Sequence, residues 1–150
     1  MTYDLVVHSG TIVTVNASFE IIPNGLLCIK AGKIQRIESM PSNKSLPPAK
    51  ESIDAADGLI MPGLVNTHTH LPMTLFRGLA DDLPLDIWLN QHIFPTEGAH
   101  INPDNVRWAA LLACAEMLLS GTTCCCGGYF HENSVARAVF ESGSQLHVGM

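Results

Sequence analysis

Two histidines, His68 and His70, are the residues of this chain whose spacing most directly predicts chemistry. They follow an apolar segment that runs from residue 59 to residue 65. Leu64–Val65 and its β-branched neighbours are typical of a strand that is buried on both faces in a parallel sheet. Residues i and i+2 of a strand project to one face, so both imidazoles point the same way from the carboxyl end of the strand. Because zinc and similar metals bind imidazole nitrogens at ~2.0–2.1 Å, the pair predicts half of a metal site. The alternative is two histidines that only hydrogen-bond to backbone at a strand end.

The remaining reactive residues form no second metal or catalytic motif. His131–Glu132 does not begin a zinc-protease signature, because Val135 stands where the second histidine would be. The chain also lacks the H-x-E…P-C-x-x-C pattern of cytidine-deaminase-type enzymes. Three consecutive cysteines, residues 124–126, cannot converge on one tetrahedral ion and fit no disulfide framework, so we expect reduced thiols. The other histidines are interpreted as surface or helix residues: His8, His92, His100 and His147.

Composition narrows the class of protein. With 150 residues the chain is large enough for one domain with a core but too short for a closed (β/α)₈ barrel, which takes ~250 residues. The formal net charge of −6 and the lack of a basic cluster argue against a nucleic-acid partner. There is no signal-peptide pattern and no uninterrupted apolar stretch of membrane-spanning length. We therefore expect a cytoplasmic protein that does not bind a membrane.

The first part of the chain reads as short strands separated by turns. Apolar and β-branched segments predict one or two strands over residues 3–16, at 5–7 and 11–15, and further strands at 26–30, 33–38 and 53–55. Ala31–Gly32 is predicted to form a hairpin turn, and residues 41–50, rich in Pro, Ser and Lys, an exposed loop. The pattern changes to helical periodicity after Gly58, which predicts a β element over 1–58 and an α/β domain over 59–150.

Helices and strands alternate after His70. A short amphipathic helix is predicted over residues 85–92, with Pro95 ending it, and Trp88 either packs in a core or lines a pocket. Asn102 is a good cap for a helix over 103–119. A strand over 122–126, a helix over 134–142 and a strand over 145–148 follow. This order predicts the beginning of a βαβ series with parallel strands.

The segment from Pro62 to Gly78 closely resembles the first barrel strand of the amidohydrolase superfamily, in the branch that deaminates 5'-methylthioadenosine, S-adenosylhomocysteine and related purines or triazines. The similarity continues through residues 86–89, 95–97 and 121–123, and spans essentially the whole chain. The chain departs from many relatives at Gly127, where they carry Asp. It also has no arginine over 145–150 to hold an amino-acid carboxylate, which disfavours S-adenosylhomocysteine as substrate.

The resemblance implies an α/β fold: the N-terminal part of a metal-dependent (β/α)₈ TIM barrel, preceded by part of a β-sandwich domain. It implies that His68 and His70 are metal ligands for Zn²⁺ or another divalent metal such as Fe²⁺. It also implies that Glu97 binds substrate by accepting hydrogen bonds from ribose hydroxyls, where the residues alone favour a solvated loop carboxylate. His131 is a surface residue or a substrate contact. No catalytic acid or base is assigned within this chain, because the remaining ligands and the proton-shuttling Glu are expected beyond Met150.

The function implied for the full-length protein is metal-dependent hydrolytic deamination of adenosine derivatives, giving the inosine analogue and ammonia. Its partner would be a small-molecule nucleoside, and the full-length form is expected to be a homo-oligomer. The alternatives are a triazine, guanine or cytosine ring hydrolase of the same branch, or a non-catalytic truncated fragment. The 150-residue chain alone is expected to be inactive, because two histidines make an open, weak metal site.

Overall fold

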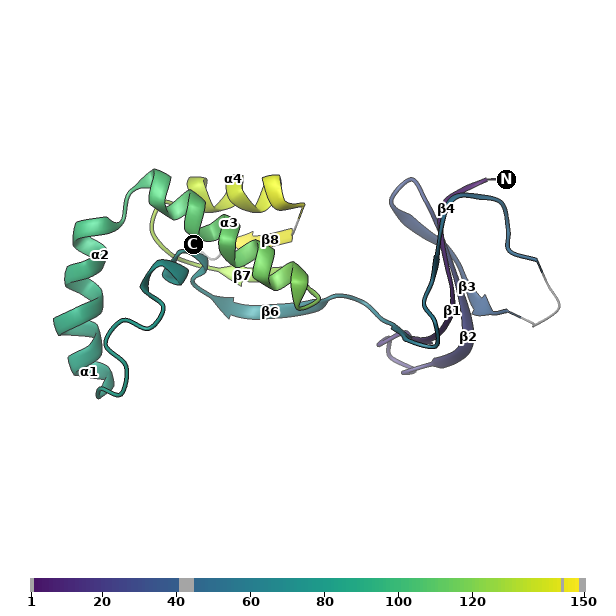
Figure 1. The fold of residues 1–150 in the computed structure, drawn as a ribbon, viewed down its shortest axis with the longest axis horizontal. Coiled ribbons are helices and arrows are strands. Elements are labelled where there is room, and N and C mark those ends of the chain that lie inside the picture. The colour runs from purple at the N-terminus through teal and green to yellow at the C-terminus, as the bar shows by residue number, and fades with distance from the viewer. Residues whose placement is uncertain (1, 41–44, 144, 149–150) are drawn as a thin grey trace. The chain divides into compact units, whose positions relative to one another are not determined.

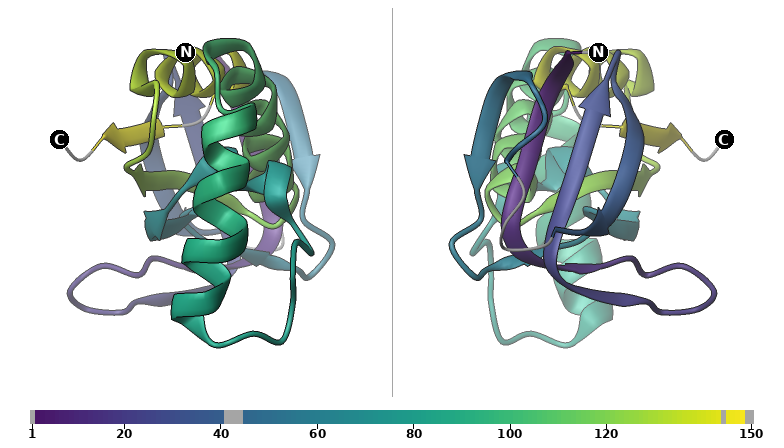
Figure 2. Two further views of the ribbon diagram at one scale, coloured as in Figure 1. Left: turned by 90° about the vertical axis from the view of Figure 1, so that its left-hand side faces the viewer. Right: turned by 90° about the vertical axis from the view of Figure 1, so that its right-hand side faces the viewer.

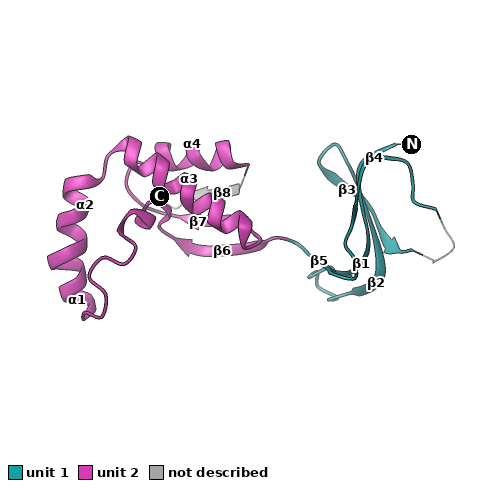
Figure 3. Ribbon diagram, in the orientation of Figure 1, with its two compact units in different colours: residues 1–62 teal, residues 63–150 magenta. Residues whose placement is uncertain are grey.

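The computed structural model describes residues 2–40, 45–143 and 145–148, the last of these for the backbone only. The chain forms two compact units, Met1–Pro62 and Gly63–Met150 (Figure 3). The change of pattern after Gly58 predicts a boundary near that residue, and the compact units divide a few residues later, before Gly63. None of the helices in the described ranges has the length and apolar character needed to cross a membrane.

Unit 1 is built on one five-stranded sheet with the order β3-β2-β1-β4, in which β5 also pairs with β1. Its strands are β1 (Tyr3–Val13), β2 (Ile21–Lys30), β3 (Lys33–Ser39), β4 (Ala49–Asp54) and β5 (Leu59–Ile60). They can be followed in the right-hand view of Figure 2. The first three are antiparallel neighbours, and β4 and β5 run parallel to β1. Val6, Leu26 and Cys28 form the core of this unit, because alternate residues of β1 and β2 face inward.

One prediction for unit 1 is wrong in detail and another is confirmed. Of the one or two strands predicted over residues 3–16, the structure has one, β1, because Ser9 at φ 65° absorbs an irregularity without ending the pairing with β2. The predicted loop over 41–50 is shorter, since Ala49 and Lys50 belong to β4; residues 41–44 lie outside the described part. The Ala31–Gly32 turn is confirmed, and φ values of 50° and 70° are those a two-residue hairpin turn requires.

Unit 2 contains a three-stranded parallel sheet with the order β6-β7-β8, formed by β6 (Leu64–Thr69), β7 (Thr122–Gly127) and β8 (Gln145–Val148). The connecting helices α3 (Pro103–Leu119) and α4 (Glu132–Ser142) lie against one face of the sheet (Figure 1). The parallel βαβ series is therefore confirmed. Apart from Leu71, the core between helices and sheet is made of small and β-branched side chains: Val106, Ala110, Ala113, Cys114, Cys125, Val135, Ala138 and Val139.

The bounds of α3 are those predicted, because its capping signals are local. The Asn102 side chain accepts hydrogen bonds from the backbone N–H groups of Asp104 and Asn105 at 3.1 and 3.0 Å. Helix α4 begins two residues earlier than predicted, at Glu132, and ends at Gly143, whose φ of 75° is the left-handed conformation of a C-terminal glycine.

The segment between β6 and α3 differs from the prediction. It contains the 3₁₀ turn η1 (Leu71–Phe76), then α1 (Leu85–Ile87), the π-helical turn η2 (Trp88–Ile93) and α2 (Phe94–His100). Figure 1 shows the last three as one continuous coil, so Pro95 does not end the helix. Pro95 lies in the first turn of α2, directly after the π turn, where its missing N–H is tolerated.

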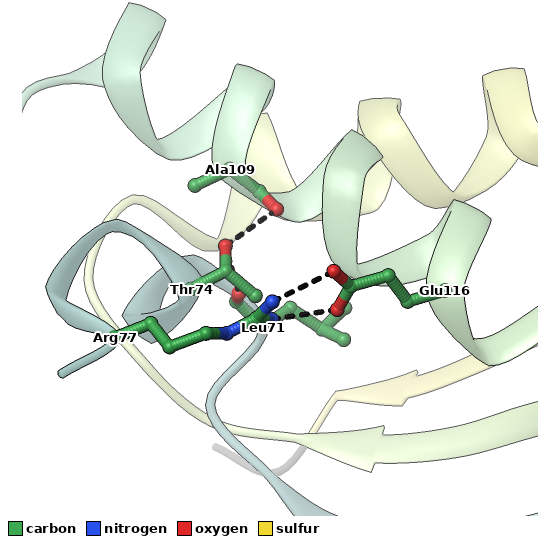
Figure 4. A network of polar contacts seen from close by, with 5 residues as sticks. All are labelled: Leu71, Thr74, Arg77, Ala109 and Glu116. Atoms are coloured by element: carbon green, nitrogen blue, oxygen red, sulfur yellow. Dashed lines mark hydrogen bonds and ion pairs between the residues drawn. The ribbon is translucent and has the colours of Figure 1, made fainter.

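A polar network fixes η1 on α3 (Figure 4). The Thr74 hydroxyl donates to the Ala109 carbonyl at 2.9 Å. Arg77 forms two hydrogen bonds with the Glu116 carboxylate, at 2.8 and 2.6 Å. Since η1 begins directly after His70, this network also holds the carboxyl end of β6.

Candidate functional site

His68 and His70 lie at and just beyond the carboxyl end of β6, and both side chains are exposed. Their ring centroids are 5.1 Å apart and the planes are inclined by 73°. Two imidazoles bound to one tetrahedral ion at ~2.1 Å place their centroids about 5 Å apart. The spacing therefore suits a shared metal ion.

Backbone of the neighbouring strand end orients His70. Its Nδ1 lies 2.5 Å from the carbonyl oxygen of Gly128, just after β7. Because a carbonyl oxygen can only accept, Nδ1 carries the proton and the lone pair of Nε2 is available to a metal. This is how metal-binding histidines are commonly fixed in one tautomer.

The described residues supply two candidate metal donors rather than a complete ligand set. His68 and His70 line a cavity of about 210 Å³ together with Cys126 and Gly127. No cluster of three or more His, Cys, Asp or Glu with metal-binding geometry occurs in the described ranges. The donor chemistry fits a divalent metal that takes its other ligands from elsewhere.

Glu97 is on α2 and is 9% exposed, so it is not a solvated loop carboxylate. It shares a cavity of about 510 Å³ with His70. The remaining lining is mostly apolar or aromatic: Met73, Trp88, Leu89, Ile93, Phe94, Gly128, Tyr129 and Phe130. The structure thus brings Glu97 and His70 to one cavity, while His68 lies with His70 in the smaller cavity beside it.

Tyr129 is the direct partner of Glu97, and no motif or spacing in the sequence predicted this contact. Its hydroxyl donates a hydrogen bond to Oε1 of Glu97. Burial, and then the hydrogen bond to Glu97, raise the pKa of Tyr129 well above its usual range, so the hydroxyl stays protonated. Its ring lies 5.8 Å from that of His70. The usable sequence signal is position: Tyr129 lies two residues beyond the carboxyl end of β7, where functional residues of parallel strands gather.

Trp88 and His131 complete the lining on the Glu97 side. Trp88 lines the cavity that contains His70 and Glu97, and its indole N–H donates to the Leu79 carbonyl at 3.0 Å. Trp88 therefore lines the pocket, and the hydrogen bond to Leu79 fixes the orientation of its ring. His131 lines an adjacent cavity with Glu97 and has a left-handed φ of 56°.

The other predicted histidine positions are mostly as expected. His92 and His100 are on helical turns. His8 is a correction: it lies in β1 with its side chain only 14% exposed and Nδ1 2.7 Å from the Ser9 hydroxyl, because the irregularity at Ser9 brings the two together. His147 lies in β8, where side chains are outside the described part.

Residues 59–150 match the amidohydrolase family. The chain is 47% identical over 140 residues to the 5-methylthioadenosine/S-adenosylhomocysteine deaminase of Lawsonia intracellularis, an alignment that covers 93% of the chain and 32% of that protein. It is 55% identical over 108 residues to the 5'-deoxyadenosine deaminase of Methanothermobacter thermautotrophicus, covering 72% and 25% respectively. The crystal structure of a zinc-bound adenosine deaminase from Xanthomonas campestris superposes with a TM-score of 0.91 at 36% identity, covering 97% of this chain and 33% of that one.

These likenesses confirm the predicted resemblance and fold class, the N-terminal part of a (β/α)₈ barrel preceded by part of a β-sandwich. The chain spans about a third of the length of the curated relatives that it matches. The family match covers more than half of the chain, including both histidines at the end of β6 and the helix that carries Glu97. The chain belongs to the amidohydrolase family.

Proposed function

We propose that the full-length protein that contains this chain is a metal-dependent deaminase of adenosine derivatives. The observation that carries the proposal is the cavity shared by His70 and Glu97. The cavity contains a candidate metal ligand and a buried carboxylate. A nucleoside needs both kinds of group, the metal near its base and the carboxylate near its sugar. The names of the similar proteins, which are deaminases of adenosine derivatives, support this reading.

His68 and His70 would hold the metal, with Glu97 binding the substrate. A bound divalent metal supplies a water of lowered pKa, the nucleophile that hydrolytic deamination requires. Glu97 can accept hydrogen bonds from adjacent ribose hydroxyls, because an ionised carboxylate has about four acceptor positions. Zn²⁺ is the proposed metal, since imidazole ligands suit it and the similar adenosine deaminase structure contains zinc; Fe²⁺ is the alternative.

The cavity favours nucleosides with an apolar 5' group. The side chains that face Glu97 include Trp88, Phe94 and Phe130, and no lysine or arginine contributes to the described lining. A methylthio or methyl group can bury apolar surface there, whereas the amino-acid part of S-adenosylhomocysteine needs a charged partner. We therefore propose 5'-methylthioadenosine or a similar compound as the preferred substrate. Ring hydrolases of the same branch are the rival class, and for these a buried sugar-binding carboxylate has no use.

The remaining assignments follow the same proposal. Residues 1–58 would be the N-terminal segment of the β-sandwich and residues 59–150 the first β/α units of the barrel. The full-length protein is proposed to be a cytoplasmic homo-oligomer without a nucleic-acid or membrane partner, consistent with the net charge of −6.

The test is ammonia release by the full-length protein loaded with Zn²⁺. We expect release from 5'-methylthioadenosine with formation of the inosine analogue, a much lower rate with S-adenosylhomocysteine, and none after metal removal. Residues 1–150 alone should release none. Activity on a triazine, guanine or cytosine, without activity on any adenosine derivative, would overturn the proposal in favour of the rival class.

A further inference from the structure

We infer that Tyr129 is a positioning residue, which holds the Glu97 carboxylate in the orientation that receives the sugar hydroxyls. The inference rests on the proposed function, because it concerns the same carboxylate. Neither residue type nor sequence spacing indicates it, since Tyr129 and Glu97 are 32 positions apart and belong to different elements.

The burial of Glu97 makes a partner necessary. A carboxylate removed from water costs free energy unless hydrogen bonds compensate it. Within the described ranges, the hydrogen bond from Tyr129 is the polar contact recorded for the Glu97 side chain, and no described lysine or arginine pairs with it. Tyr129 therefore decides which way the carboxylate faces.

A phenol hydroxyl suits this role better than a cation. It occupies one acceptor position on Oε1 and leaves the others available to a ligand. It also brings no opposite charge to the carboxylate, whose remaining acceptor positions a sugar hydroxyl can approach as a donor. An arginine would instead occupy both oxygens and neutralise them.

Tyr129 is itself fixed from three sides. Its backbone N–H donates to Oε1 of Glu132, the first residue of α4. Its ring lies 5.1 Å from that of Phe130 and 5.8 Å from that of His70. The preceding residue, Gly128, accepts the hydrogen bond from His70. The short connection between β7 and α4 thus contacts both the candidate metal ligand and the candidate sugar-binding residue.

The experiment compares Tyr129→Phe with the wild type in the full-length, Zn²⁺-loaded protein. The substitution removes one hydroxyl and keeps the ring. We measure the affinity by calorimetry, and KM and kcat by ammonia release, for 5'-methylthioadenosine and for its analogue that lacks the 2'- and 3'-hydroxyls. We expect KM for the ribose substrate to rise about 10- to 100-fold, the range for a lost hydrogen bond to a charged group, while kcat changes little.

The analogue separates positioning from a general structural role. If Tyr129 acts through Glu97, the substitution should raise KM for the analogue less than about 3-fold. In addition, the double variant Glu97→Gln/Tyr129→Phe should bind the ribose substrate no more weakly than Glu97→Gln alone. The matched control is Tyr3→Phe in unit 1, which should leave all values unchanged.

Three results would overturn the inference. The first is an equal loss of affinity for both nucleosides in Tyr129→Phe, and the second is additive losses of affinity in the double variant. The third is an affinity for the ribose substrate that Tyr129→Phe leaves unchanged. Failure of the proposed function gives a different result. A wild type that releases no ammonia overturns the deaminase proposal, while the ribose-dependent binding measured by calorimetry still decides whether Tyr129 positions Glu97.

Discussion

Glu97 and Glu116 lie on consecutive helices of unit 2, and the protein satisfies their charges in opposite ways. Glu116 has a side chain that is 43% exposed, and it accepts two hydrogen bonds from Arg77 in the contact between η1 and α3 (Figure 4). Glu97 is 9% exposed, and its recorded partner is the neutral hydroxyl of Tyr129. Arginine compensates the charge of the exposed carboxylate, whereas the structure shows no lysine or arginine of the described residues paired with the buried one.

The difference separates scaffold from site. A bidentate arginine binds both oxygens of Glu116, compensates its charge and fixes the turn after His70. Glu97 differs in both respects. It is buried beside an aromatic cavity, which costs free energy, and the hydrogen bond from Tyr129 leaves other acceptor positions of the carboxylate open to a ligand. Four predictions test this contrast, beginning with the largest effect.

The largest effect is expected at the metal ligands. His68→Ala and His70→Ala should each remove most of the metal bound by the full-length protein, because a divalent ion held by fewer ligands dissociates readily. Deaminase activity should fall below detection. Elemental analysis after gel filtration measures the metal content. His92→Ala, on a helical turn outside both cavities that His70 lines, is the control and should retain full metal content. An unchanged metal content in the His68→Ala/His70→Ala double variant would show that these histidines are not metal ligands.

The second effect contrasts the two carboxylates directly. Glu97→Gln should lower kcat/KM for ribose substrates about 100-fold, since it weakens two charge-assisted hydrogen bonds. Glu116→Gln should change kcat/KM less than about 2-fold, because its charge acts within the scaffold. The measurement is steady-state ammonia release with 5'-methylthioadenosine. If the two variants lose activity equally, the distinction between site and scaffold is wrong.

Local patterns made much of this region predictable. The place of His68 and His70 at the carboxyl end of a parallel strand and the helix over 103–119 follow from spacing, capping and periodicity, which neighbouring residues encode. That His70 lies just beyond β6 rather than within it was not predicted. The passage of the helix through Pro95 was not predictable, because the π turn that accommodates it depends on how the whole segment packs. The Tyr129–Glu97 contact was also missed. It joins residues from two elements, and such pairs leave no periodic trace in the sequence.

The third effect concerns the core that supports both regions. Val106→Ala removes two methyl groups from a fully buried position between α3 and the sheet. It should lower the free energy of unfolding by about 2 kcal/mol, through lost burial and a small cavity. KM should stay unchanged. Urea denaturation and steady-state kinetics measure the two quantities. An altered KM would mean that the core and the Glu97 site are more closely coupled than the contacts indicate.

The smallest effect is expected at the ion pair of Arg77 and Glu116, and its sign depends on pH. The hydrogen bonds from Arg77 hold the pKa of Glu116 below its ordinary value of 4.5, so the pair stabilises the fold above that value. The contribution is lost as the pH falls through the lowered pKa, because the protonated carboxyl no longer attracts the guanidinium. Arg77→Gln should therefore lower Tm by a few degrees at most at about pH 7, and the two proteins should converge near pH 2. Calorimetric scans at several pH values measure the difference. A gap that stays constant down to pH 2 would show that Arg77 acts through packing rather than through its charge.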